Sequence, residues 1–422
     1  MPRVFLMIAA LSVCGVANAQ TLEGFASLPA DTFAPGPTSG QLIPPPPPNG
    51  RMTPFVDSQP VQGFSSVLRA SNGDYLAMPD NGFGAKDNSP DYVLRVYRIS
   101  PEFRTKHGGS GTIDVKSYIT LRDPDGRIKF PIVADADFYP GTSTPVDPRI
   151  QRRRWLTGGD FDIESVREAP DGTLWFGDEF GPFLIHTDKT GKVLEAPYPL
   201  PNVQSPQNPF LGSGAFNLPR SKGFEGMAIS PNGRKLYPML EGALTTDTDQ
   251  RRLIINEFDL KSRAYTGRQW FYRLDSPAFA IGDLTTVEKD LFLVIERDNN
   301  QGVAAAFKKI FIVDFKQVDS AGYLIKHEVA DLLQIDDPYD IGRFGPVFRF
   351  PFQTIESVIP LGSRRLGILD DNNYPFSSAR NPGEPDPNEF IIIKLDQPTR
   401  QFARPGWQED DDDGKDGGSG KR

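Results

Sequence analysis

A short pattern recurs five times along this chain, and the repetition limits the possible folds more than any other feature. Each copy has a polar or acidic turn, then a strand that starts with Glu-Ser-Val or a variant of it. A second strand follows and ends in a cluster of Asp, Asn, Glu and Gly. The copies start near residues 63, 160, 222, 282 and 354 and close at residues 80–83, 178–181, 241–242, 296–300 and 370–373. Such self-similarity predicts a fold assembled from repeated supersecondary units.

The segments within these copies are typical of short β-strands. Runs such as Tyr92–Ile99, Leu253–Leu260 and Lys309–Phe315 are rich in β-branched and aromatic residues, and turn dipeptides such as Asn72-Gly73 separate them. A short helix at His327–Leu333 is the one predicted exception. Many short strands at even spacing indicate a sandwich, a barrel or a propeller. The repeat favours the propeller, and a fortuitous repeat in an all-β sandwich is the alternative.

The spacing of the copies sets the expected number of blades. Equivalent positions fall at residues 65, 164, 225, 285 and 356, so the steps are 99, 61, 60 and 71 residues. Steps near 60 suit a four-stranded blade with a generous loop, and the step of 99 leaves room for an unmarked blade. We therefore predict an all-β fold, a β-propeller of about six four-stranded blades with seven as the alternative, over residues 55–398.

The first 19 residues have the pattern of a secretory signal peptide. Arg3 supplies the positive charge, Val4–Val16 is an apolar run, and Ala17-Asn18-Ala19 is a small-residue cleavage site. The run is too short for a membrane span, and Val13 makes a lipidation signal at Cys14 a poor match. Cys14 is the only cysteine, so we expect a secreted or periplasmic protein without disulfides.

The remaining flanks and the overall charge point to a soluble monomer. Residues 20–54, with Pro44–Pro48, predict an extended Pro-rich segment, and residues 399–422 predict a disordered acidic tail. The formal net charge is −9 and no extended basic run is present, so we expect neither a nucleic-acid nor a membrane partner. Arg152-Arg153-Arg154 is the densest basic cluster, and is either a solvated loop or a phosphate-steering patch.

Acidic residues at one repeat position are the candidate site. Glu164, Glu225 and Glu356 share that position, with Ser65 and Thr285 as neutral variants. The innermost strands of a propeller face a central channel, so these carboxylates would meet around one axis. Like charges nearby raise one another's pKa, and a bound divalent cation is the simplest compensation. Oxygen ligands without thiolates predict Ca²⁺, with Mg²⁺ as the alternative.

The clusters that close each copy extend the set of candidate ligands. A lone Asp before Gly, such as Asp125 or Asp171, is more typical of a turn, and the three histidines lack the spacing of a zinc site. The predicted metal ligands are Glu164, Glu225, Glu356, Asp178, Asp80, Glu296 and Asp298.

Several of these stretches resemble the bacterial phytase-like proteins, a family described as having "esterase-like activity of phytase". The resemblance rests on GDFDIES at 159–165, DEFGPF at 178–183, KGFEGMA at 222–228, ERDN at 296–299, FPFQTIESV at 350–358 and DDNNYP at 370–375. It covers roughly residues 55–396. It implies a propeller-type domain and hydrolysis of phosphate esters, phytate included. Calcium-binding β-propeller phytases are a more distant comparison, and none of their catalytic residues can be matched here.

We therefore hypothesise a small phosphate ester as the substrate. Glu164, Glu225, Glu356 and Asp178 would hold one or two Ca²⁺ ions, which would activate water for in-line attack. The predicted catalytic residues are Glu179 or Asp371 as general base, and Arg297 and Lys222 as cations that neutralise the phosphate or pair with the same carboxylates.

Two other functions are compatible with the sequence. One is a metal-dependent propeller lactonase, for which Asn81, Asn299 and Asn372 would be suitable additional ligands. The other is a non-catalytic binding propeller in which the cation only ties blades together.

Overall fold

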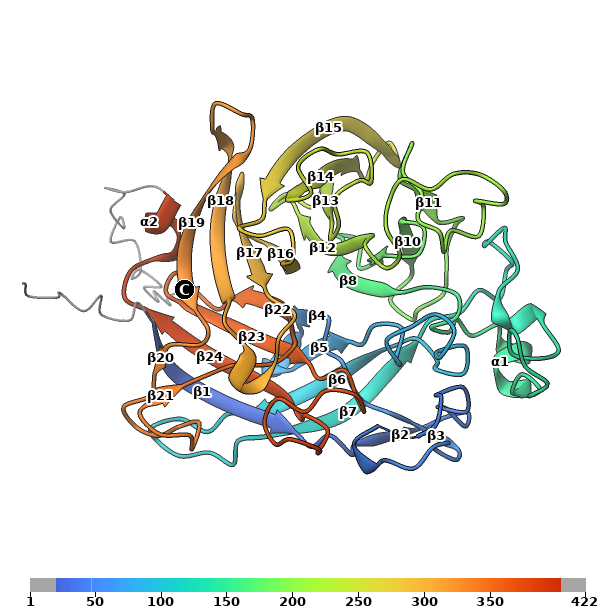
Figure 1. The fold of residues 1–422 in the computed structure, drawn as a ribbon, viewed down its shortest axis with the longest axis horizontal. Coiled ribbons are helices and arrows are strands. Elements are labelled where there is room, and N and C mark those ends of the chain that lie inside the picture. Colours follow the sequence, from blue (N-terminus) through green and yellow to red (C-terminus); the bar gives the residue numbers. More distant parts are fainter. Residues whose placement is uncertain (1–19, 47, 404–422) are drawn as a thin grey trace, which may run out of the picture.

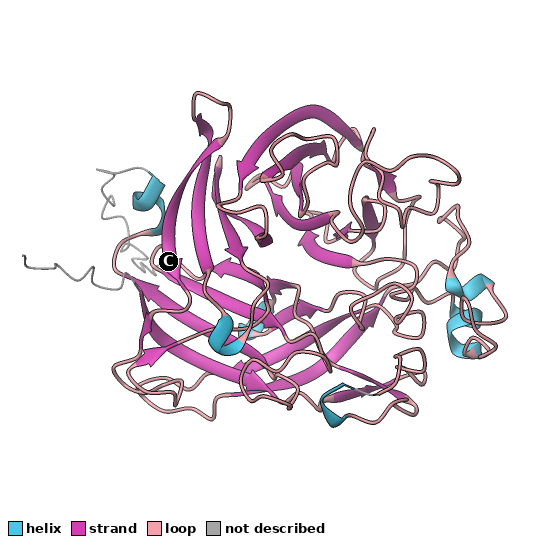
Figure 2. Ribbon diagram, viewed as in Figure 1, coloured by secondary structure: helices cyan, strands magenta, loops and turns pink. Residues whose placement is uncertain are grey.

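The computed structural model describes residues 20–46 and 48–403, and within them nearly every regular element is a β-strand (Figures 1 and 2). Five four-stranded antiparallel units account for most of the strands. The first blade consists of β4 (Ser66–Arg69), β5 (Tyr75–Met78), β6 (Arg95–Glu102) and β7 (Thr112–Thr120), and the second of β8 (Ile163–Glu168), β9 (Leu174–Asp178), β10 (Phe183–Thr187) and β11 (Tyr198–Pro199). The third consists of β12 (Phe224–Ile229), β13 (Lys235–Leu240), β14 (Arg252–Asp259) and β15 (Ala264–Arg273), and the fourth of β16 (Ala280–Glu288), β17 (Leu291–Arg297), β18 (Lys308–Val318) and β19 (Leu324–Asp331). The fifth consists of β22 (Thr354–Pro360), β23 (Arg365–Asp371), β24 (Asn388–Leu395) and β1 (Gln20–Leu28).

The first strand of each unit lies innermost, and these strands close into a ring. In cyclic order β4 packs on β8, β8 on β12, β12 on β16, β16 on β22, and β22 again on β4. Figure 1 shows the units arranged around this centre. The fold is therefore a closed β-propeller, and the predicted fold class is confirmed.

The ring has five blades in the described part of the chain, so the expected sixth blade is absent. The long step between Ser65 and Glu164 contains no four-stranded unit. Residues 121–162 instead form loops with η3 (Val133–Asp135) and α1 (Pro148–Arg153). Their apolar side chains, including Ile132 and Ile150, pack in one cluster with Phe161 and Val166 at the start of the next blade. An insertion stabilised by this packing therefore accounts for the extra residues.

The N-terminal segment completes the last blade. Strand β1 pairs antiparallel with β24, in a register that runs from Gln20 opposite Leu395 to Leu28 opposite Asn388. A single bridge from Ser27 to Thr112 also links β1 to β7. Residues 20–28 therefore belong to the propeller rather than to a separate segment that ends near residue 54.

Two further expectations differ from the structure. His327–Leu333, predicted as a helix, lies mostly in strand β19, where His327 pairs with Ile312. The segment pairs with β18 and packs against its apolar residues. This packing decides in favour of a strand over the helix that the local sequence predicts, because an outer strand needs only one buried face. Thr399–Ala403, assigned to a disordered tail, form the short helix α2. The predicted signal peptide and the acidic run after residue 403 lie outside the described residues.

The remaining elements are short and peripheral. They are β2 (Phe33–Pro35) paired with β3 (Ser58–Pro60), β20 (Ile335–Asp336) paired with β21 (Val347–Phe348), and η1 (Pro48–Gly50), η2 (Ser71–Gly73) and η4 (Gly302–Ala304). No helix among the described residues has both the length and the apolar character needed to cross a membrane.

Candidate functional site

A β-bulge at the same place in four inner strands aims one residue per blade at the channel. The pairing of β8 with β9 skips Glu164, that of β12 with β13 skips Glu225, and that of β22 with β23 skips Glu356. Bulges of this kind commonly redirect a side chain beside a functional site. In the first blade, whose inner strand has no bulge, Ser65 directly precedes β4.

The bulge in the fourth blade corrects the alignment of the repeats. The pairing of β16 with β17 skips Gly282, so Gly282, not Thr285, is equivalent to the three glutamates. A Cβ atom at Gly282 would lie 2.0 Å from the carbonyl oxygen of Ile355. The backbones of β16 and β22 approach too closely there for any side chain. We call Ser65, Glu164, Glu225, Gly282 and Glu356 the first tier.

A second tier lies at or just after the end of the second strand in each blade. Strand pairing places Asp178 opposite Ile163, Leu240 opposite Phe224, Glu296 opposite Ile281 and Asp370 opposite Ile355. The next residue in each blade, together with the residue at the matching place after β5, forms a set of equivalent positions. This second tier consists of Asp80, Glu179, Glu241, Arg297 and Asp371.

The two tiers together hold seven carboxylates and one guanidinium, and all eight side chains are buried. Burial disfavours the charged form of a carboxyl group, and neighbouring carboxylates add to the effect. Burial raises the pKa of Glu356 to about 7 and that of Asp80 to about 6. Burial also raises the pKa of Glu164, Glu179 and Glu225 well above the ordinary range, with further contributions from nearby acids.

Within the described residues, two groups of carboxylates are compact enough for a cation, and they share one member. In the first group, one oxygen each from Asp80, Asp162 and Glu164 lie within 4.8 Å of one another. The second group has the same spacing for Glu164, Glu179 and Glu225. Glu164 therefore belongs to both groups.

The donor atoms fit a divalent cation. Oε1 of Glu179 and Oε1 of Glu225 are buried and accept no hydrogen bond from any described residue. Unpartnered buried carboxylate oxygens are costly, and a hard cation such as Ca²⁺ or Mg²⁺ takes such oxygens as ligands. The buried acidic cluster is thus compatible with a divalent metal.

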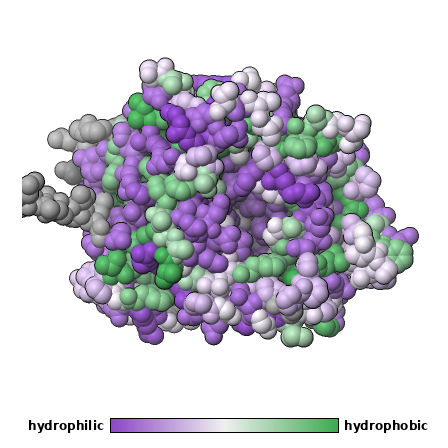
Figure 3. Space-filling view, in the orientation of Figure 1, coloured by the Kyte–Doolittle hydropathy of each residue, from purple (hydrophilic) through white to green (hydrophobic). Residues whose placement is uncertain are grey.

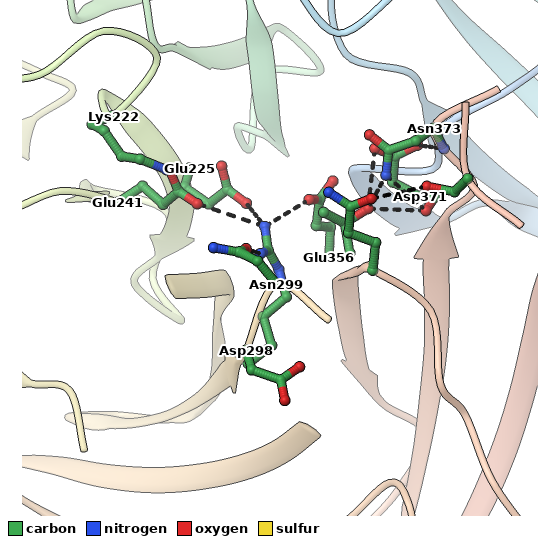
Figure 4. A network of polar contacts seen from close by, with 12 residues as sticks. Lys222, Glu225, Glu241, Asp298, Asn299, Glu356, Asp371 and Asn373 are labelled. Carbon is green, nitrogen blue, oxygen red and sulfur yellow. Dashed lines mark hydrogen bonds and ion pairs between the residues drawn. The ribbon is translucent and has the colours of Figure 1, made fainter. Parts of the chain in front are cut away.

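Arg297 occupies the position in the second tier where the other blades have an acid. Its Nη2 lies 3.2 Å from Glu356, 3.6 Å from Glu241 and 3.9 Å from Glu225. Figure 4 shows Glu225 and Glu241 on one side and Glu356 on the other, with dashed lines from all three to one guanidinium. Arg297 thus faces one member of the second metal-sized group, Glu225, and two glutamates that lie outside both groups.

Two further predicted catalytic residues lie beside this arginine. Lys222 forms an ion pair with Glu241, and its side chain is 38% exposed, so it reaches solvent. Oδ1 of Asp371 accepts the backbone N–H of Asn373 at 2.7 Å. Burial raises the pKa of Asp371 well above its ordinary value, with Glu356 and Asp80 adding to the shift. Figure 3 shows hydrophilic residues around a hollow in the centre of this face of the molecule.

Four predicted metal ligands lie outside both groups. One is Glu356, which faces Arg297, and the oxygens of the other three have different partners. Asp178 accepts the backbone N–H groups of Asp162 and Gly181 at 2.9 and 2.8 Å. Glu296 is bound by Tyr272, the N–H of Asp275 and Lys326, each at 2.6 Å. Asp298 accepts the N–H groups of Ala306 and Phe307 and pairs with Lys308 at 3.0 Å. Figure 4 shows Asp298 pointing away from the glutamates.

Sequence reasoning missed two acids that lie in the site. Asp162 precedes β8 by one residue, and Asn81 Nδ2 donates to its Oδ1 at 2.7 Å. Burial raises the pKa of Asp162 to about 8, and Asp80 contributes. Glu241 closes the third repeat but was left out of the candidate set. The sequence contained the information needed to find Glu241, because this residue stands at the same repeat position as Glu179.

The solved structures that this chain matches are only remotely similar to it. The β-propeller domain of Cps50 (Swd1) from Myceliophteria thermophila is 10% identical, with a TM-score of 0.31, over 77% of this chain and 68% of that one. The calcium-binding protein regucalcin from Agrobacterium tumefaciens is 13% identical, with a TM-score of 0.32, over 79% of this chain and 77% of that one. The assignment of the propeller rests on the closed ring of inner strands.

Sequence comparison gives the family. A protein of the fungus Arthroderma benhamiae, named an uncharacterized secreted protein, is 24% identical over 58% of this chain, and the match spans 59% of that relative. The model of the Phytase-like family, described as "Esterase-like activity of phytase", matches residues 59–374, so the chain belongs to this family.

Proposed function

We propose that this protein is a metal-dependent hydrolase of small phosphate esters, with its site in the mouth of the channel. The observation that carries the proposal is the pair of carboxylate groups joined by Glu164, in which two buried oxygens accept no hydrogen bond from a described residue. Membership of the Phytase-like family supports phosphate esters as the substrate class.

The residues of both groups would hold the metal. Asp80, Asp162 and Glu164 would bind one cation, and Glu164, Glu179 and Glu225 a second, with Glu164 shared. Ca²⁺ suits the all-oxygen set, and Mg²⁺ is the second choice. A divalent cation supplies a Lewis acid that polarises a phosphoryl oxygen and lowers the pKa of water.

The neighbouring residues have separate tasks in this proposal. Asp371 lies outside both groups, and a raised pKa makes its carboxylate a stronger base for taking a proton from the attacking water. We prefer it to Glu179, which belongs to a metal-sized group and has an oxygen that accepts no hydrogen bond from a described residue. Lys222, which is partly exposed, would contact the phosphate as it enters.

Arg297 is a positioning residue in this mechanism. Its guanidinium is buried and already faces three glutamates, so its charge goes mainly to them. It would hold Glu225 in place beside Glu164 and oppose the rise in the pKa of Glu356 that burial causes, because a neighbouring cation favours the charged carboxylate.

We further propose that the protein acts outside the cytoplasm as a monomer on a small-molecule substrate. The pattern of residues 1–19 supports export, and the fungal relative carries the word secreted in its name. A net charge of −9 opposes the binding of nucleic acid.

Activity assays on the purified protein test this function. Release of phosphate from p-nitrophenyl phosphate and from phytate should require Ca²⁺ or Mg²⁺, stop after chelation and return when the metal is restored. Asp371→Asn should lower kcat at least a hundredfold, because the base is lost. Ser378→Ala, a change outside the two tiers, serves as the control.

A panel of lactones separates the nearest alternative. Turnover of a lactone without any release of phosphate would replace the proposed reaction by a lactonase. A metal-dependent rise in melting temperature without turnover of any ester would indicate a binding protein.

A further inference from the structure

A second candidate binding site lies at the rim of the propeller, between the first and second blades. It is a groove of about 800 Å³. Its walls come from the outer strand β7, from the insertion 121–162, from the turn that follows β10, and from residues 35–36. The outermost strand of a blade is far from the inner ring, so this groove is separate from the channel.

The charge of the groove is opposite to that of the whole chain. Five cations line it, and none of its lining residues is Asp or Glu, although the chain has a net charge of −9. The cations come from four separate segments, which the fold brings together. They are Arg95, Arg122, Arg149, Arg153 and Lys189.

Arg95 is the buried member of this set. It is only 1% exposed, its Nη2 donates to the carbonyl oxygen of Pro35 at 2.9 Å, and its guanidinium lies 4.0 Å from the ring centre of Tyr118. Its Nε and Nη1 have no hydrogen-bond partner, and Arg95 takes part in none of the ion pairs found among the described residues. An uncompensated buried charge is costly, and an anion in the groove would offset that cost.

The remaining cations are available to a ligand to different degrees. Arg153 and Lys189 are exposed and form no ion pair with a described residue, and Arg153 lies 5.0 Å from the ring centre of Trp155. The guanidinium of Arg122 is held by two neutral oxygens of Thr190, at 2.6 and 2.8 Å.

Arg149 contributes least to the field of the groove. It pairs with Asp57 at 3.0 Å and with Asp147 at 2.8 Å, so its charge is already balanced. The positive field therefore comes mainly from the other four cations.

We infer that this groove binds a small polyanion that carries two or more phosphate groups. Guanidinium groups match the paired oxygens of phosphate, and several separated cations favour a ligand with more than one anionic group. The volume suits a molecule of metabolite size. An extended nucleic acid needs a longer basic surface. This inference does not depend on the reaction in the channel.

Trp155 supplies an optical probe for the test. Inorganic tripolyphosphate is titrated into the full-length protein after removal of divalent metals, because oligophosphates themselves chelate such ions. Intrinsic fluorescence and calorimetry follow the binding at 150 mM salt. The expected result is saturable binding of one tripolyphosphate with a change in fluorescence that Trp155→Phe removes.

Two double variants of equal charge change locate the site. Arg153→Ala/Lys189→Ala should weaken binding at least tenfold. Arg234→Ala/Lys261→Ala, which removes two exposed cations from turns of the third blade, should leave the affinity unchanged. Equal weakening in both variants would overturn the inference, since it would reflect only diffuse charge.

Competing anions test the phosphate chemistry. Citrate, with three carboxylates, should bind at least tenfold more weakly than tripolyphosphate. Equal affinity for citrate would contradict a groove selective for phosphate, and the absence of saturable binding would contradict a site of any kind.

Discussion

Arg167 and Asp283 form a buried ion pair across the axis of the propeller, with 3.0 Å between Nη2 and Oδ1. Arg167 lies on β8 and Asp283 on β16, and these inner strands are not neighbours in the ring. The same guanidinium reaches Ser66 Oγ on β4 at 3.1 Å, and Asp283 accepts the N–H of Val358 on β22 at 3.1 Å. One pair thus ties together four of the five inner strands, next to the first tier.

Removing the arginine should destabilise the protein strongly. Arg167→Met leaves Asp283 buried without its cation, and loss of one partner of a buried pair costs about 3–5 kcal/mol. Urea unfolding measures the change. The double variant Arg167→Met/Asp283→Asn should recover part of the loss. A cost below about 1 kcal/mol for the single variant would show that the pair does not hold the ring together.

Glutamates of the same tier should differ in their effect on metal binding. Glu164→Gln should weaken binding of Ca²⁺ at least tenfold and lower the number of sites, because Glu164 belongs to both carboxylate groups. Glu356→Gln is the matched control, since Glu356 lies outside both groups and faces Arg297. Calorimetric titration gives the stoichiometry for each. Equal losses in the two variants would contradict a shared role for Glu164.

Without metal, stability should fall as pH rises from about 4 to 8. Burial raises the pKa of Asp80 to about 6, that of Glu356 to about 7 and that of Asp162 to about 8. A raised pKa means that the folded state holds protons which the unfolded chain has released. The contribution of each group to the free energy of unfolding therefore falls as pH rises through this window. Melting temperatures after chelation, measured between pH 5 and 8.5, test the trend.

Added Ca²⁺ should reverse this dependence. The metal needs deprotonated ligands, so the stabilisation by Ca²⁺ should grow with pH over the same window. A Ca²⁺ effect that is equal at pH 5 and pH 8 would argue against carboxylate ligands with raised pKa values.

Deletion of residues 20–28 should prevent stable folding. Strand β1 buries Leu22, Phe25 and Leu28, each worth about 1.5–3 kcal/mol, and it covers the edge of β24. The sum is comparable to the whole stability of a domain. Circular dichroism and limited proteolysis measure the outcome, with addition of a synthetic peptide of residues 20–30 as the rescue. A deleted protein with an unchanged melting temperature would contradict this role of β1.

The propeller and part of the candidate site could be predicted from the sequence, because both produce patterns among residues that are close together in the chain. The step of about 60 residues reflects one blade, and the repeated glutamates stand at real bulges. The error of three residues at Thr285 arose because the fourth blade has Gly282 at the bulge, and a missing side chain leaves no chemical signal. Only the register of β16 against β17 shows the correct alignment.

Other features depend on contacts that a linear pattern does not encode. Asp178, Glu296 and Glu179 look alike in the sequence, yet the first two are bound to backbone, tyrosine and lysine groups. Their neighbours in space come from distant segments, such as Lys326 beside Glu296. The same is true of the basic groove, because its five cations are gathered from four segments.

The closure of the last blade by β1 also determines the order in which this protein can reach its folded state. The first described strand pairs with the last, β24, so the four other blades can form while the ring is still open. Until β24 emerges, β1 has no antiparallel partner, and unpaired strand edges of this kind are prone to pair with other chains. A chain that has only partly emerged, from a ribosome or through an export channel, therefore cannot close the ring. Until β24 is available, the unpaired edge of β1 stays exposed to pairing with other chains.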